Sequence, residues 1–137
     1  MSKKGAEYDA QLPDWYWKRG LHDAKILSVC ELKLVPDWKE KHPKRNCLEI
    51  LLDGKNALFE TNIKKISLYN YRITDMNMNG VKPITLEAFR NVYWLGDSID
   101  RLDDGKYLLE IECTDSRSNL MSLNVKFEIP QIEGISD

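Results

Sequence analysis

Residues 103–129 read DDGKYLLEIECTDSRSNLMSLNVKFEI, and this stretch decides the fold class. Two runs in which apolar and polar residues alternate, 107–113 and 121–129, are separated by the polar segment 115–119. Alternation with a period of two is typical of β-strands that are buried on one face. The Asp104-Gly105 pair before the first run favours a hairpin turn, because glycine readily adopts positive φ. The stretch therefore predicts two antiparallel strands joined by a turn, with another hairpin turn just before them.

Other segments repeat this alternation. Residues 24–34 predict a long, half-buried strand, and residues 47–53 and 57–63 predict a hairpin around Asp53-Gly54. Within residues 66–73 the apolar positions change parity twice, which indicates a bulge, a bend or an irregular link instead of one straight strand. The whole chain is expected to form six or seven strands in mostly antiparallel order.

The segments between these strands carry turn and helix signals. Residues 36–46 and 74–83 are rich in charges and turn residues and are expected to be loops, and Pro130 is expected to end the last strand. A short helix is expected at 13–20, where the proline suits a first turn, and another at 85–91, capped by its first residue.

Length and helix content bound the architecture. The 137 residues are expected to form a single domain, 1–137, with residues 1–12 as a loose N-terminal arm. An antiparallel sheet with one apolar face needs a cover, and the expected helices are too few to provide it. We therefore expect a mainly β fold, an antiparallel sheet curved into a sandwich or partly open barrel with one or two short helices. A two-layer α+β fold is the second choice.

Composition places the chain in a broad class. Hydrophobic residues are 42% and charged residues 31%, which excludes the disordered and membrane classes. The basic N-terminal residues are not followed by the apolar segment of a secretory signal. Cys30, Cys47 and Cys113 lie within apolar runs and are expected to be buried, reduced thiols. A cytoplasmic protein is the expectation that follows.

One pair of residues, His22-Asp23, is a candidate for catalytic chemistry. The glycines lack the spacing of a phosphate loop, no GxSxG motif is present, and no Cys/His cluster has zinc-ligand spacing. We therefore expect no catalytic residue, metal or cofactor. His22-Asp23 could act as a general base or metal ligand at a strand edge. The favoured interpretation is that the pair turns the chain where the first strand begins, because adjacent residues of an extended chain point to opposite faces.

The net charge of −2 conceals an uneven distribution. Up to Arg45 there are ten basic and seven acidic residues, and beyond it ten basic and fifteen acidic. The segment 93–115 contains two cations and seven carboxylates, which are Asp97, Asp100, Asp103, Asp104, Glu110, Glu112 and Asp115. They form either a solvated hairpin face or an acidic patch that binds a basic partner. The basic loop beside Trp38 is diluted by acidic residues, so no nucleic-acid partner is expected.

The segment 15–34, WYWKRGLHDAKILSVCELKL, resembles the opening of small bacterial immunity-type proteins of polymorphic toxin systems and related uncharacterised families. In those families an aromatic lead-in, here Trp15 to Trp17, precedes a Leu-His-Asp-Ala motif that runs into the first strand, here Leu21 to Ala24. The resemblance implies a small cytoplasmic β-rich protein that acts by binding another protein and has no catalytic residues.

These observations favour a non-enzymatic protein-binding module, an immunity protein that neutralises a toxin, with no membrane or nucleic-acid partner. Because three consecutive aromatics cannot all face a core, at least one is expected to be exposed or to lie at an edge, where it could anchor an interface. The slightly favoured interpretation is a helix clamped between sheet and loop, with Trp15 and one neighbour buried. The candidate binding residues are Trp15, Trp17, His22, Asp23, Asp97, Asp100, Asp103 and Asp104. Two alternatives stay open: a small-ligand binder or enzyme with a pocket near His22, and a homo-oligomer subunit that pairs through a strand edge or the aromatic segment.

Overall fold

The computed structural model describes residues 23–41, 43–53 and 64–133. In this part of the chain the fold is mainly β, as the alternation predicts. One sheet contains nine strands in the order β5-β4-β8-β7-β6-β1-β2-β3-β9, every pairing is antiparallel, and the sheet does not close into a barrel. The elements are β1 (Lys25–Lys33), β2 (Asn46–Asp53), β3 (Lys65–Tyr69), β4 (Arg72–Met78), β5 (Lys82–Pro83), the 3₁₀ helix η2 (Leu86–Ala88), β6 (Val92–Arg101), β7 (Tyr107–Thr114), β8 (Leu120–Phe127) and β9 (Ile129–Glu133). A membrane-spanning helix is not found among the described residues.

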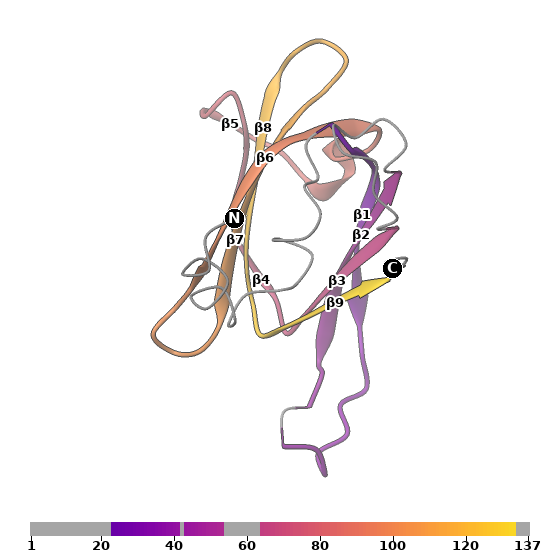
Figure 1. Cartoon of the computed structure of the whole chain (residues 1–137), viewed down its shortest axis with the longest axis vertical. Helices are drawn as coiled ribbons and strands as arrows, with labels where there is room; N and C mark the ends of the chain where they lie inside the picture. Colours follow the sequence, from indigo (N-terminus) through magenta and orange to yellow (C-terminus); the bar gives the residue numbers. More distant parts are fainter. Residues whose placement is uncertain (1–22, 42, 54–63, 134–137) are drawn as a thin grey trace, which may run out of the picture.

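The sheet folds over on itself into two facing layers (Figure 1). The first layer contains β4 to β8, and the second contains β1, β2, β3 and β9. Apolar side chains from both layers meet in one core cluster, whose largest fully buried members are Trp94, Phe89 and Phe127. Each such side chain contributes about 1.5–3 kcal/mol through its removal from water, so the core is the main source of stability.

On one side the layers are joined by a short pairing of β1 with β6, in which Ile26 lies opposite Val92. Just before β1, Asp23 adopts a left-handed backbone conformation with a φ of 68°, and its N–H donates to the carbonyl of Trp94 at 2.6 Å. The N–H of Trp94 donates in return to the carbonyl of Ala24 at 2.8 Å. Asp23 therefore turns the chain at the start of the first strand.

On the other side, β3 continues into β4 and β8 into β9, and both pass from one layer to the other (Figure 1). Tyr69 lies opposite Ile129 before the bend, and Arg72 lies opposite Lys126 after it, so the register is the same on both sides. The bend occurs at Asn70, which has a φ of 55°. One antiparallel ladder therefore turns the corner between the layers without losing its register.

A bulge in β1 changes which side chains are buried. The extra residue is Leu27, where the register with β2 shifts. Ile26 is buried before the bulge and Val29 after it, so Cys30 and Leu32 are exposed. One added residue reverses the face that every later side chain takes. The expectations of an unbroken alternation in this strand and of a buried thiol at Cys30 were wrong for this reason.

Three other expectations were also wrong. Residues 74–83 are not all turn, because β4 continues to Met78 and β5 follows a turn in which Asn79 and Gly80 have positive φ. Pro130 does not end a strand, since it lies inside β9, at the edge of the sheet, where a missing N–H is tolerated. These short elements raise the number of strands above the six or seven expected.

Several sequence expectations are confirmed. The hairpin at 103–106 joins β6 to β7, and Gly105 has the positive φ, 83°, that its turn requires. The parity change within 66–73 is the bend at the corner, and a short helix lies within 85–91 as η2, although Thr85 forms no side-chain capping hydrogen bond, contrary to expectation. Other predicted features lie outside the described residues: the arm 1–12, the helix 13–20, Trp15, Trp17, His22 and the hairpin arm 57–63.

Candidate functional site

The four carboxylates of the β6–β7 hairpin that were predicted to bind a partner lie in different surroundings. Asp97 is half-buried, and its carboxylate accepts a hydrogen bond from the indole Nε1 of the buried Trp94 at 2.7 Å. Asp104 lies in the turn at the far end of the hairpin, 3.0 Å from Nζ of Lys126. The remaining two are exposed: Asp100 and Asp103. The four predicted residues therefore do not form a single patch.

A groove of about 320 Å³ lies over strands β4, β6, β7 and β8. Glu110 and Glu112 alternate along β7 with buried apolar residues, so they point away from the core. Asp75 from β4 and Asp97 from β6 bring the number of carboxylates to four. We call this surface the acidic groove, and the described residues that line it are Asp75, Asp97, Ser98, Glu110, Glu112, Ser122 and Asn124. No lysine or arginine is among them.

The hydrogen-bond donors of the acidic groove are neutral. The Ser98 hydroxyl donates to Oε1 of Glu110 at 3.1 Å, and the amide of Asn77 donates to Oδ2 of Asp75 at 2.8 Å. Asp75, Glu110 and Glu112 form no ion pair with any residue that the structure describes. The negative charge of these three carboxylates is therefore left for the solvent or for a partner to compensate.

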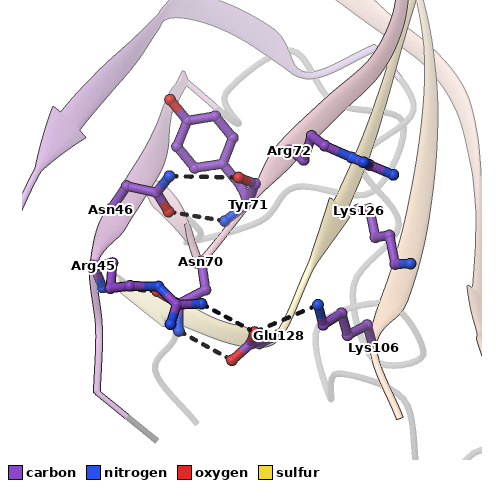
Figure 2. Close-up of a pocket in the computed structure, with 8 residues that line it drawn as sticks. All are labelled: Arg45, Asn46, Asn70, Tyr71, Arg72, Lys106, Lys126 and Glu128. Carbon is purple, nitrogen blue, oxygen red and sulfur yellow. Dashed lines mark hydrogen bonds and ion pairs between the residues drawn. The ribbon is translucent and has the colours of Figure 1, made fainter. Parts of the chain in front are cut away.

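A second hollow, of about 260 Å³, lies where the sheet turns its corner (Figure 2). Four cationic side chains meet there from separate segments: Arg45 precedes β2, Arg72 begins β4, Lys106 precedes β7 and Lys126 lies in β8. We call this site the basic corner, and the described residues that line it are Arg45, Asn46, Asn70, Tyr71, Arg72, Lys106, Lys126 and Glu128. No local pattern in the sequence predicts this site.

Glu128 provides the one carboxylate among the described lining residues of the basic corner. Its Oε2 lies 3.7 Å from both Nη2 of Arg45 and Nζ of Lys106, which approach it from opposite sides (Figure 2). Its Oε1 accepts a hydrogen bond from Nδ2 of Asn70 at 3.0 Å. Hydrogen bonds between charged groups are about 2.7–2.9 Å long. Because both cations lie 3.7 Å from the carboxylate, each keeps N–H groups that can bind a ligand.

Two asparagines hold the backbone of the basic corner. Asn70 accepts the N–H of Arg45 at 2.7 Å and donates to the carbonyl of Pro43 at 3.0 Å. Asn46 accepts the N–H of Tyr71 at 3.0 Å and donates to the carbonyl of the same residue at 3.4 Å (Figure 2). These bonds replace the ladder bonds that the bend interrupts, and they fix the walls of the hollow.

The Tyr71 side chain is turned toward β1, where its hydroxyl donates to the carboxylate of Glu31. Burial is the largest cause that raises the pKa of Tyr71 well above its usual value, and the contact with Glu31 adds to it. The phenol therefore stays protonated at neutral pH and brings no negative charge to the basic corner.

Comparisons with protein-family models, with curated proteins and with solved structures find no match for this chain. Within the described ranges, no group of three or more His, Cys, Asp and Glu side chains is placed to hold a metal ion. The fold and the two surfaces together define only a structural class. It is a two-layered antiparallel β domain that carries an acidic groove and a basic corner.

Proposed function

We propose that this protein is a non-enzymatic binding module of the immunity type. It neutralises a basic toxin by binding the toxin's basic surface with the acidic groove. The acidic groove carries the proposal, because four carboxylates from three strands line it without a lysine or arginine among its described residues. The resemblance of residues 15–34 to immunity-type proteins points to the same class of function.

Asp75, Glu110 and Glu112, which form no ion pair with a described residue, favour a basic partner for two physical reasons. Their summed field attracts positive charge over a distance of about 8–10 Å at moderate ionic strength, which speeds association. The same field repels acidic proteins and so selects among partners. A toxin that binds nucleic acid needs a basic surface for that purpose, and a protein with an acidic groove can cover that surface.

The buried thiols are poorly suited to nucleophilic catalysis. Burial raises the pKa of Cys113 to about 12 and also raises that of Cys47. Because the thiolate is the reactive form, both groups are almost entirely unreactive thiols at neutral pH.

Co-expression with each product of the adjacent genes tests the proposal. We expect one of these products to stop growth when expressed alone and the present protein to restore growth. The double variant Glu110→Gln/Glu112→Gln is expected to bind that product about tenfold more weakly, with most of the loss in the association rate. Surface plasmon resonance at low and high salt measures both rates.

The matched control is the double variant Glu40→Gln/Glu87→Gln, which removes two exposed carboxylates away from the groove. We expect this control to bind and to restore growth as well as the wild type. The proposal is wrong if no adjacent product is toxic or bound, or if the groove variant and the control bind equally.

A further inference from the structure

We propose that the basic corner is a binding site for the phosphate group of a small phosphorylated molecule. This inference concerns a different surface from the acidic groove and does not depend on the proposed function. It rests on the charge of the hollow, on the arrangement of its cations, on its rigid backbone and on the acidic surface beside it.

The charge of the basic corner matches that of a phosphate monoester. Four cations line it, Glu128 is shared between two of them, and Asp104 pairs with Lys126. Two positive charges are therefore left uncompensated. A phosphate monoester carries a charge of about −1.5 to −2 at pH 7 and has three strong acceptor oxygens.

Arg72 is the cation with the most donors available. It is exposed, and it forms no ion pair with any residue in the described part of the chain. The register places it directly opposite Lys126, so two cations stand side by side on neighbouring strands. Like charges placed opposite each other are destabilising, and an anion between them removes that cost. The planar guanidinium can bind two phosphate oxygens at once.

The backbone around these cations is held in place before a ligand arrives. The hydrogen bonds of Asn46 and Asn70 fix the segments that carry Arg45 and Arg72. A site whose walls are already ordered loses less conformational entropy when it binds. Ligand binding therefore orders only the ends of the long side chains that line the hollow.

The surroundings favour a small ligand over a nucleic acid. Asn124 is the outward residue of β8 just before Lys126, and it lies opposite Glu110 of the acidic groove. The two positions are about 7 Å apart along a strand, so a long polyanion that enters the basic corner would meet carboxylates at its next phosphate. Nucleic-acid surfaces instead provide a continuous positively charged track.

Titration of the ¹⁵N-labelled full chain with phosphate probes tests the proposal. The probes are inorganic phosphate, glycerol 3-phosphate, uncharged glycerol and a single-stranded oligonucleotide, all at low ionic strength. We expect the two phosphates to shift the backbone amide signals of Asn70 and Arg72 in a saturable way, and glycerol to leave them unchanged. Isothermal titration calorimetry gives the dissociation constants.

Arg72→Gln is the decisive variant, and Arg90→Gln is its control, because both arginines are exposed and Arg90, in the link between η2 and β6, lies outside the basic corner. We expect Arg72→Gln to bind glycerol 3-phosphate about tenfold more weakly, as the loss of a charged two-pronged contact requires, and Arg90→Gln to bind it as the wild type does. Arg45→Gln, on the opposite wall, is expected to weaken binding as well. Thermal melting checks that each variant is folded.

Four outcomes would overturn the proposal. The first is the absence of saturable shifts with either phosphate. The second is equal binding by Arg72→Gln and the wild type, and the third is an equal loss in Arg90→Gln, which would indicate a diffuse effect of net charge. The fourth is tighter binding of the oligonucleotide than of glycerol 3-phosphate at the same amides, which would assign the corner to nucleic acid.

Discussion

The acidic groove and the basic corner carry opposite charges, and they are built in different ways. The groove places its carboxylates on the outer face of neighbouring strands, two of which have register shifts close to Asp75 and Asp97, and neutral side chains donate to Asp75 and Glu110. The corner gathers its cations from four segments that meet at a bend, around one shared carboxylate and two asparagines. The groove therefore depends on the sheet alone, whereas the corner depends on one specific turn of the backbone.

This difference separates what each surface can bind. An outer strand face on which Asp75, Glu110 and Glu112 form no ion pair with a described residue suits a broad partner that covers it. A concave bend with fixed walls suits a compact ligand that several cations contact at once. Variants that disrupt one of these two surfaces and leave the other intact test this difference most directly.

The largest effect is expected for Asn70→Ala. The side chain makes three hydrogen bonds at the bend, and alanine at a φ of 55° adds backbone strain. We expect the free energy of unfolding to fall by about 2–4 kcal/mol, measured by urea denaturation. Asn91→Ala is the control for strain alone, since Asn91 has a φ of 57° and no side-chain hydrogen bond among the described residues, and it should cost about 1 kcal/mol. Equal losses in both variants would contradict a special role for the bend.

Glu128→Gln should strengthen phosphate binding. The change removes the carboxylate between Arg45 and Lys106 and keeps an acceptor for the amide of Asn70. We expect glycerol 3-phosphate to bind about threefold more tightly, because a nearby negative charge is gone. Glu110→Gln in the acidic groove should leave this affinity nearly unchanged. Weaker binding by Glu128→Gln would mean that its carboxylate serves to position the cations.

A smaller effect is expected when the acidic groove loses charge. Glu110 and Glu112 stand at successive outward positions of β7 and repel each other. The double variant Glu110→Gln/Glu112→Gln should therefore be more stable than the wild type by about 0.5 kcal/mol at low ionic strength. The gain should vanish in about 1 M salt, where charges are screened within about 3 Å. A gain that survives high salt would point to a cause other than repulsion.

The smallest effect concerns the pH dependence of stability at Asp104. The ammonium group of Lys126 and then the N–H of Lys106 lower the pKa of this carboxyl group. A carboxyl whose pKa is lower in the folded state stabilises the protein above its unfolded pKa of about 3.9, and the contribution is lost as the pH falls through the folded pKa. Asp104→Asn should therefore be less stable than the wild type at pH 7 and equal to it in strong acid. Asp103→Asn, at the exposed neighbouring position, is the control, and an equal loss of stability at pH 7 in this variant would contradict a role for the contact between Asp104 and Lys126.

The fold class could be predicted from the sequence because alternation survives in the strands that carry the core. It is unbroken from Tyr107 to Cys113 and from Met121 to Phe127, and both strands are where the pattern places them. The prediction from alternation failed in β1, because the bulge at Leu27 moves every later side chain to the opposite face of the strand. The composition of the sequence does not change at that point. The short edge strand β5, whose two residues are both exposed, is too short to leave a pattern.

The candidate sites were predictable only in part. The excess of carboxylates in β6 and β7 is visible in the sequence, but Asp75 joins the acidic groove through the pairing of β4 with β8, which no local pattern reveals. The basic corner joins segments far apart in the chain. In the sequence Arg45 belongs to a charged loop and Lys106 to a turn. Asn70 between two tyrosines was the available signal, since asparagine tolerates positive φ at a bend.

The ladder that keeps its register around the corner has a consequence for local opening. Two stacked layers joined only at one seam could separate while each kept its own hydrogen bonds. Here the strand pair from Lys65 to Met78 and from Met121 to Glu133 belongs to both layers, so neither layer can detach without breaking pairs in the other. The amides on the two sides of the bend, such as those of Leu68 and Val125, should exchange with deuterium at similar rates, as parts of one cooperative unit.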